Sequence, residues 1–141
     1  MAEGATYLRS SGDPSRRFTN YYPAWLDNLA DDVTIEGSLL NGTVDGPDNV
    51  RAVVTGLRSL YEHQEFNFAG PYRENGWIED YVAEVGGEPI ACVVLVSRNA
   101  AGQTQHIAAN YRPLDSLLFL SRALRERLAG SPIAEHFAVG D

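Results

Sequence analysis

Apolar and polar residues alternate with the period of a β-strand through most of the second half of the chain. Four such segments are separated by short glycine-containing turns: residues 65–72, 77–85, 89–98 and 104–112. Consecutive strands joined by short turns favour an antiparallel meander. The third segment contains the run Ile-Ala-Cys-Val-Val-Leu-Val, which is apolar on both faces. We therefore expect a central strand, covered by helices on one face and by a partner subunit on the other.

Two other segments show the period of an amphipathic helix. The first follows Pro47 and has apolar side chains at helical spacing: Val50, Val53, Val54, Leu57, Leu60 and Tyr61. The second follows Pro113 and ends before Gly130, with Leu114, Leu117, Leu118, Leu124 and Leu128 as its apolar residues. Proline at the first turn and glycine after the last turn are typical helix boundaries. The first helix is predicted to lie on the sheet.

The region before these elements predicts a short helix and a strand. Pro23 opens a helix in which Tyr22, Trp25, Leu26 and Leu29 share one face, and a strand follows over residues 33–38. The dipeptides Asn-Gly and Asp-Gly at 41–42 and 45–46 predict turns, so the segment between them pairs back on that strand. We divide the chain into a flexible N-terminal arm (1–20), a single domain (21–130) and a C-terminal tail (131–141) that docks through Ile133 and Phe137.

Length and charge narrow the class of protein. With 141 residues the chain forms one domain of ordinary size. Eleven Lys and Arg against 19 Asp and Glu give a net charge of -8, which disfavours binding to nucleic acid or to an anionic membrane. The longest apolar run is too short to cross a bilayer and no signal peptide is evident, so we expect a cytoplasmic protein. The only cysteine, Cys92, lies in that run and is predicted to be a core residue.

The order of elements and three motifs resemble the SnoaL-like branch of the nuclear transport factor 2 superfamily over residues 20 to 128. The motifs are Leu-Ala-Asp-Asp-Val-Thr-Ile-Glu-Gly, Asn-Gly-Thr-Val-Asp-Gly-Pro-Asp-Asn-Val-Arg and Asn-Tyr-Arg-Pro-Leu. The resemblance implies an α+β fold, in which helices cover the concave face of a cone-shaped, curved antiparallel sheet around one small-molecule pocket. Proteins of this fold include steroid isomerases, polyketide cyclases, epoxide hydrolases, dehydratases and non-catalytic binding domains, so the fold leaves the function open.

The acids that two of these enzyme classes use are missing here. The general base of steroid isomerases corresponds to Gly37, and Glu36 is one residue early, which turns its carboxylate to the other face of a regular strand. The second acid of those isomerases falls near Ala91 or Val93, and the resemblance leaves Tyr21 and Tyr22 as candidates for their catalytic tyrosine. The base of the epoxide hydrolases corresponds to Asn110, whose amide takes no proton. Both chemistries are disfavoured.

The inward face that the resemblance implies still contains one carboxylate. It carries Trp77, Glu79, Tyr81 and Ala83 from one strand and Ile107, Ala109 and Tyr111 from the last strand. We expect Glu79 to act as general acid or base, with Tyr81 or Tyr111 donating a hydrogen bond to a substrate carbonyl. Asp80 takes this place if the register slips by one residue. The expected ligand-binding residues are Trp77, Ala83, Ile35, Ala91, Val93, Ile107, Ala109, Tyr22 and Trp25.

Histidine spacing gives no support for a metal site, and we expect no metal and no cofactor. His106 shares a strand face with Asn110, opposite Tyr111, which favours an interface or solvent. The polar run His63-Gln64-Glu65 caps the first long helix or lines the pocket mouth, and capping is favoured.

Two functions therefore remain open. The first is a cofactor-independent isomerase, cyclase, dehydratase or hydrolase that acts on an apolar, ring-containing compound by acid-base catalysis. The second is a binding or accessory module that holds a hydrophobic ligand without changing it. In either case we expect a homodimer formed by the outer sheet face through residues such as Cys92, Val94 and Val82.

Overall fold

The computed structural model describes residues 17–18 and 21–140. Within these residues, seven strands, two α-helices and two 3-10 helices follow one another: β1 (Arg17–Phe18), η3 (Ala24–Asp27), β2 (Leu29–Gly37), β3 (Val44–Asp45), α1 (Pro47–Leu60), β4 (Gln64–Tyr72), β5 (Gly76–Val85), β6 (Glu88–Arg98), β7 (Thr104–Arg112), α2 (Leu114–Arg127) and η4 (Pro132–His136). Glycines in the turns, and Pro47 and Pro113 at the helix starts, separate these elements. Every long strand and helix lies within a few residues of its predicted position. Neither α-helix in the described residues has the length and apolarity needed to span a bilayer.

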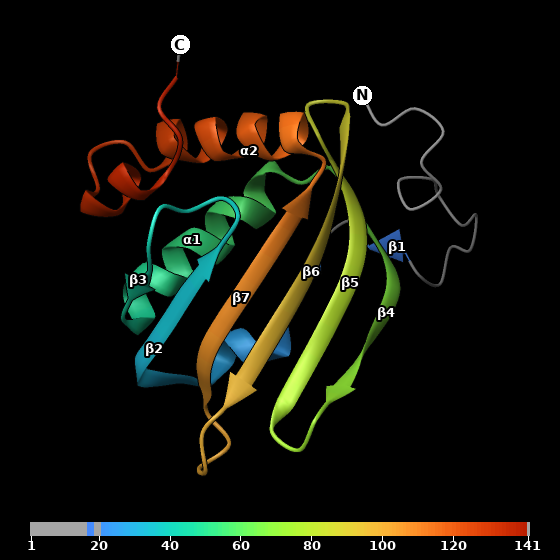
Figure 1. The fold of residues 1–141 in the computed structure, drawn as a ribbon, viewed down its shortest axis with the longest axis vertical. Coiled ribbons are helices and arrows are strands. Elements are labelled where there is room, and N and C mark those ends of the chain that lie inside the picture. The colour runs from blue at the N-terminus through green and yellow to red at the C-terminus, as the bar shows by residue number, and fades with distance from the viewer. Residues whose placement is uncertain (1–16, 19–20, 141) are drawn as a thin grey trace.

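All seven strands form one sheet in the order β1-β4-β5-β6-β7-β2-β3 (Figure 1). The predicted meander of β4, β5, β6 and β7 is antiparallel throughout, and β6 is the central strand of the sheet. Strand β3 pairs back on β2, as the turn residues predict. One pairing is parallel: β2 lies beside β7, with Ile35 opposite Ile107. The two strands are far apart in the sequence. Local alternation of apolar and polar residues therefore does not tell whether β2 runs parallel or antiparallel to β7.

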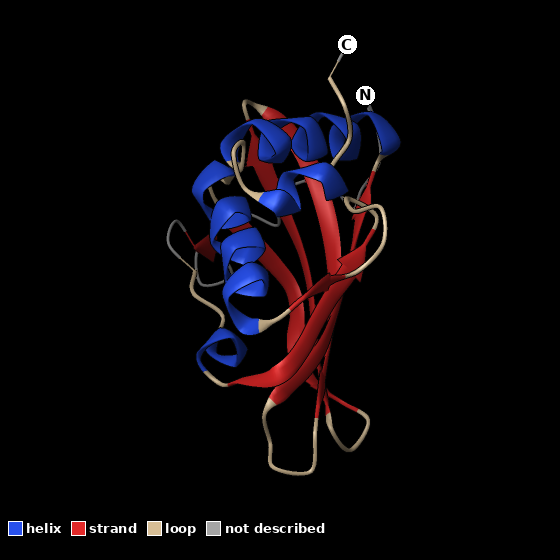
Figure 2. Ribbon diagram, turned by 90° about the vertical axis from the view of Figure 1, so that its left-hand side faces the viewer, coloured by secondary structure: helices blue, strands red, loops and turns tan. Residues whose placement is uncertain are grey.

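The helices cover the concave face of the curved sheet, as Figure 2 shows from the side. Helix α1 turns Val50, Val53 and Leu57 onto the sheet, where each is at most 6% exposed. Helices α1 and α2 approach closely at Gly56, where an added Cβ would lie 3.2 Å from the Leu124 side chain. This face, with its helices, encloses the main core, and we call it the inner face.

Helix α2 buries a narrower stripe than its leucines predict. Leu120 and Leu124 are fully buried, but Leu114 is 65% exposed. Two serines share the buried stripe, because Ser116 donates to the carbonyl of Pro89 and Ser121 to that of Leu39. These hydrogen bonds satisfy polar groups that would otherwise be costly to bury.

The two ends of the domain differ in part from the predicted division. Residues 17–18 of the expected arm form strand β1 against β4, and the rest of that arm lies outside the described residues. The short helix ends at Asp27, and Leu29 already begins β2. In the tail, Ile133 and Phe137 are buried as expected, and Arg125 donates to the carbonyl of Phe137.

The register of β6 decides which residues face inward. Glu79 on β5 stands opposite Val94, which stands opposite Ala109 on β7, so these three share the inner face. Ala91 and Val93 on β6 therefore lie on the outer face, and their predicted place in the pocket is wrong. The same register moves Cys92 and Val94 to the inner face, so of the three residues predicted for a dimer only Val82 faces outward. A continuously apolar strand carries no alternation, which is why its register was misread.

Candidate functional site

A narrow cavity lies between helix α1, the segment around η3 and the inner face of the sheet. It is lined by seven of the predicted residues: Trp25, Ile35, Glu79, Tyr81, Ile107, Ala109 and Tyr111. Its wall is mainly apolar and aromatic, and Glu79 is the one carboxylate among the described residues that line it. The structure thus brings the three predicted catalytic side chains to one cavity.

Three aromatic side chains hold the carboxylate of Glu79. Its Oε2 accepts hydrogen bonds from the hydroxyl of Tyr21 at 2.6 Å, the indole of Trp77 at 3.0 Å and the indole of Trp25 at 3.2 Å. Glu79 is only 2% exposed, and Oε1 takes part in none of these bonds. Donors from two parts of the chain, residues 21–25 and strand β5, therefore fix one oxygen and leave the other for a further partner.

Three tyrosine hydroxyls form a second polar group in the cavity. Tyr61, the C-cap residue of α1, lies 2.8 Å from the hydroxyl of Tyr81 and 2.7 Å from that of Tyr111. We call these three residues the tyrosine cluster. Burial raises the pKa of each of them above its usual range, so all three hydroxyls keep their protons at neutral pH.

Cys92 stands between Tyr81 and Tyr111 in the register of the sheet. It is fully buried, and burial raises the pKa of its thiol to about 12. A thiol in this state has almost no thiolate at neutral pH and is a poor nucleophile. The prediction of a core cysteine is confirmed.

The cavity is almost closed. Its volume is about 40 Å³, little more than the share of one water molecule and far below the roughly 300–1,000 Å³ of drug-sized ligand pockets. A second cavity of about 180 Å³ adjoins it and shares Tyr21, Arg58, Tyr61 and Gln64. These four side chains form the boundary between the two spaces, so a ring-containing ligand enters only when one of them moves.

Several predicted ligand-binding residues lie elsewhere. Tyr22 is 42% exposed, and its hydroxyl bonds to Asp27 instead of reaching the cavity. Ala83 belongs to the core beyond the cavity. Trp77 contributes its indole N–H to Glu79 but borders a separate, open hollow that shares Tyr21 with the cavity.

Sequence reasoning missed two polar residues of the site, Arg58 and Tyr61, and it named Tyr21 without placing it beside Glu79. Tyr61 belongs to the apolar stripe of α1 and was counted as core, although a tyrosine at the end of such a stripe brings a hydroxyl to the sheet. Gln64 follows the helix as predicted, and it lines the pocket mouth instead of capping. The C-cap N–H of Tyr61 bonds to backbone carbonyls.

The positions that correspond to acids of related enzymes are unsuited to that role. At Gly37 a Cβ would lie 1.9 Å from the carbonyl oxygen of Ala109, so the strand pairing leaves no room for a side chain. Glu36 faces outward as predicted, 3.7 Å from His106. Asp80 and Asn110 also lie on the outer face, both opposite Val93.

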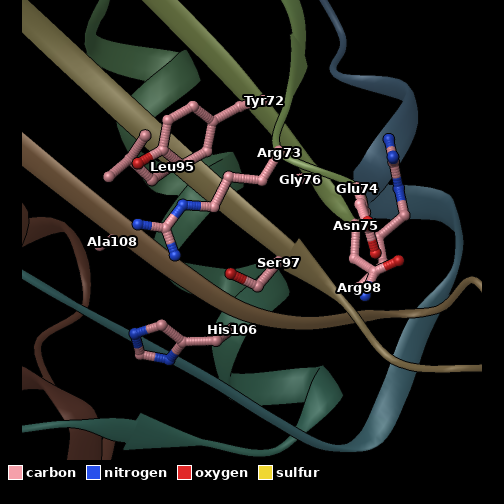
Figure 3. A pocket seen from close by; sticks show the side chains of 10 residues that line it. All are labelled: Tyr72, Arg73, Glu74, Asn75, Gly76, Leu95, Ser97, Arg98, His106 and Ala108. Atoms are coloured by element: carbon pink, nitrogen blue, oxygen red, sulfur yellow. The ribbon is translucent and has the colours of Figure 1, made fainter.

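A larger, open cavity of about 620 Å³ lies on the outer face, beside the turn between β4 and β5. Figure 3 shows Arg73, Ser97 and His106 around it. The His106 ring lies 2.7 Å from the hydroxyl of Thr34, so this side chain also links strand β7 to strand β2. Among the described residues, no three His, Cys, Asp or Glu side chains gather as a metal site.

Solved structures show what this architecture is similar to. A bacterial protein with a cystatin-like fold from Silicibacter pomeroyi superposes with a TM-score of 0.71, at 20% identity over 81% of this chain and 83% of that one. The chain has the nuclear transport factor 2-like fold. A steroid delta-isomerase from Pseudomonas aeruginosa shares this fold with a TM-score of 0.68, at 15% identity over 74% and 77% of the two chains.

An NTF-2 like protein of unknown function from Burkholderia xenovorans also has this fold, with a TM-score of 0.53 at 19% identity over 61% and 66% of the chains. No family model matches the sequence, and no curated protein matches it. The structural similarity therefore establishes the nuclear transport factor 2-like fold. The sequence identities, all of 20% or less, support the fold alone. The α+β class and the curved, helix-covered sheet are confirmed.

Proposed function

We propose that the cavity binds a small apolar, ring-containing compound and moves a proton on it without a cofactor, as an isomerase, cyclase, dehydratase or hydrolase does. The observation that carries this proposal is the pair of polar groups in one apolar cavity. A buried carboxylate has one oxygen fixed by three donors, and a hydroxyl cluster lines the same space. Base and oxyanion donor are the two parts that proton abstraction next to a carbonyl requires.

Glu79 is the proton carrier in this proposal. Tyr21, Trp25 and Trp77 fix Oε2 and thereby the orientation of the carboxyl group, so Oε1 is the atom that takes the proton from carbon and returns it. A base held in place this way loses little entropy when the substrate arrives.

The tyrosine cluster stabilises the negative charge that develops on the substrate oxygen. Its three hydroxyls carry three protons, and the two hydrogen bonds among them use two. The third O–H also has the Cys92 thiol within reach, and it donates to a ligand oxygen in place of that weak acceptor. Because burial raises the pKa of all three hydroxyls, the cluster acts as a hydrogen-bond donor and does not transfer its own proton.

The test is proton-deuterium exchange next to the carbonyl of small cyclic ketones, followed by NMR in deuterated water. We expect the wild type to accelerate exchange and Glu79→Gln to lower the rate roughly 100- to 10,000-fold. Asp80→Asn is the matched control, because it removes the same charge one residue away on the outer face, and it should keep the rate. Equal rates for wild type and Glu79→Gln, or an equal loss in Asp80→Asn, contradict the assignment.

A non-catalytic ligand-binding module is the second candidate. It is favoured by the close approach at Gly37, which excludes a side chain where steroid isomerases have their base. Mass spectrometry of compounds retained from a metabolite mixture separates the two functions. A binding module releases what it bound, whereas an enzyme releases a changed compound.

We also propose a homodimer that buries the outer face. Ile78, Val93 and Leu95 form a half-buried apolar row there, next to the buried Val82. No helix of the described residues covers this face (Figure 2). Light scattering should give twice the 15.4 kDa of one chain, and Leu95→Glu should give the single mass. A wild-type monomer at micromolar concentration contradicts the dimer.

A further inference from the structure

We propose that the pocket takes a small organic anion, whose carboxylate group binds Arg58 and Gln64 while its apolar part lies against Glu79 and the tyrosine cluster. This substrate class rests on the proposed function and makes it more specific. Arg58 and Gln64 line both the narrow cavity and the adjoining 180 Å³ cavity, so a group bound to them reaches either space.

Arg58 is a cation without a carboxylate partner among the described residues. Its Nε donates to the backbone carbonyl of Tyr21, and its guanidinium group lies over the ring of Tyr22 at 5.0 Å. These contacts fix the side chain and leave its terminal nitrogens without a hydrogen bond to another described residue. A guanidinium group presents paired donors that match the two oxygens of a carboxylate.

The carboxylates around this mouth are engaged elsewhere. Glu84 pairs with His63 at 2.8 Å, Glu62 accepts from the backbone N–H of Gly87, and Glu79 is held by its three aromatic donors. The positive charge of Arg58 is therefore available to a ligand, although the chain as a whole carries a net charge of -8. A fixed, uncompensated cation in an acidic protein is a feature that anion recognition explains.

Gln64 supplies a second donor. The residue is 6% exposed and lines both cavities, yet its side-chain amide makes no hydrogen bond within the described residues. The amide is not among the fully buried, unpartnered atoms of the described residues, so its N–H is open to the cavity and available to a ligand oxygen. One guanidinium group and one neutral amide offset a single negative charge, which fits a monocarboxylate better than a phosphate dianion.

Tryptophan fluorescence provides a direct readout. Trp25 and Trp77 are the two tryptophans of the chain, and both donate to Glu79. Benzoate and its neutral isostere benzamide are the probes, because they differ in charge and little in shape. We expect wild type to bind benzoate roughly tenfold more tightly than benzamide, with a preference that weakens as salt is added.

Arg58→Gln should abolish this preference, and Arg58→Lys should retain part of it, because lysine keeps the charge and loses the paired donors. Arg73→Gln, which removes an equal charge at the outer cavity, should leave the preference unchanged. The comparison of the two probes in wild type needs no variant, so it stands even if Arg58→Gln does not fold.

Three results overturn the proposal: equal affinities of wild type for the two probes, no saturable benzoate binding below about 10 mM, or an equal loss in Arg73→Gln. Proton transfer is judged separately, on neutral ketones. The exchange of neutral ketones and the preference for benzoate over benzamide are both measured on wild type, so the anion site and the proposed chemistry can fail independently.

Discussion

The hydroxyl of Tyr21 donates a hydrogen bond of 2.6 Å to Oε2 of Glu79, although the two residues are 58 positions apart in the chain. The same tyrosine accepts a hydrogen bond from Arg58 through its backbone carbonyl and packs its ring against Phe66, with ring centroids 4.6 Å apart. Tyr21 thus contacts three parts of the site: the carboxylate of Glu79, the guanidinium group of Arg58 and the aromatic ring of Phe66. Tyr21 therefore lines both cavities and is also a direct partner of Glu79.

Replacing Tyr21 with Phe removes this hydrogen bond and keeps the ring. We expect the free energy of unfolding to fall by about 1–2 kcal/mol, because a bond to a buried charged group is lost. Urea unfolding measures the change. Tyr22→Phe is the matched control, since its hydroxyl bond to Asp27 is exposed, and it should cost less than about 0.5 kcal/mol. Equal losses in the two variants would contradict a special role for Tyr21.

Alkaline pH should destabilise the fold. Burial raises the pKa of Tyr21, Tyr61, Tyr81, Tyr111 and Cys92 in the folded state. In the unfolded chain these groups lose protons near their usual values of 10.0 and 9.0, while the folded protein still holds them. Their stabilisation is complete below pH 9 and is lost as the pH rises through and above that range.

Urea unfolding between pH 7 and about 11 tests this dependence. Each group contributes a slope of up to about 1.4 kcal/mol per pH unit where only the unfolded state has lost its proton. Tyr61→Phe should reduce the slope, and Tyr72→Phe, which changes an exposed tyrosine on the outer face, should not. Stability that is constant up to pH 11 would be the contrary result.

Gly37→Ala should destabilise the protein by at least about 3 kcal/mol, because the new Cβ meets a backbone carbonyl that pairing with β7 holds in place. The predicted contact is 1.9 Å, at a φ of +154°. Gly102→Ala is the control at another glycine of positive φ, where nothing lies within 4 Å, and it should cost only the backbone strain of about 1 kcal/mol. Thermal unfolding compares the two, and similar losses would show that steric contact is not the cause.

Phe137→Ala tests how firmly the tail is docked. Phe137 is 1% exposed, so its truncation should cost about 3–5 kcal/mol. Val139→Ala, two residues further on and 70% exposed, should be nearly neutral. If both variants unfold at the wild-type urea concentration, the tail contributes nothing to the folded domain.

The sequence determined the local elements of this protein. Alternation and turn residues located the meander, and the period of the apolar residues located α1, because both signals depend on neighbours a few positions away. Alternation also grouped Glu79 with Tyr81 on one strand face, since a strand turns every second side chain to the same side. The resemblance to the fold family, and not alternation, turned that face inward and added Tyr111. A cytoplasmic location and the role of Glu79 remain predictions.

Only the tertiary structure decided the relations between distant segments. The parallel pairing of β2 with β7, the inward turn of Cys92 and Val94, and the meeting of Tyr21 and Tyr61 with the sheet all depend on contacts across more than 20 residues of chain or on the register of an unpatterned strand. Side-chain alternation repeats every two residues and carries no information about which partner a strand selects. The carboxylate was therefore readable from the sequence, whereas its three donors, the tyrosine cluster and the cation at its mouth were not.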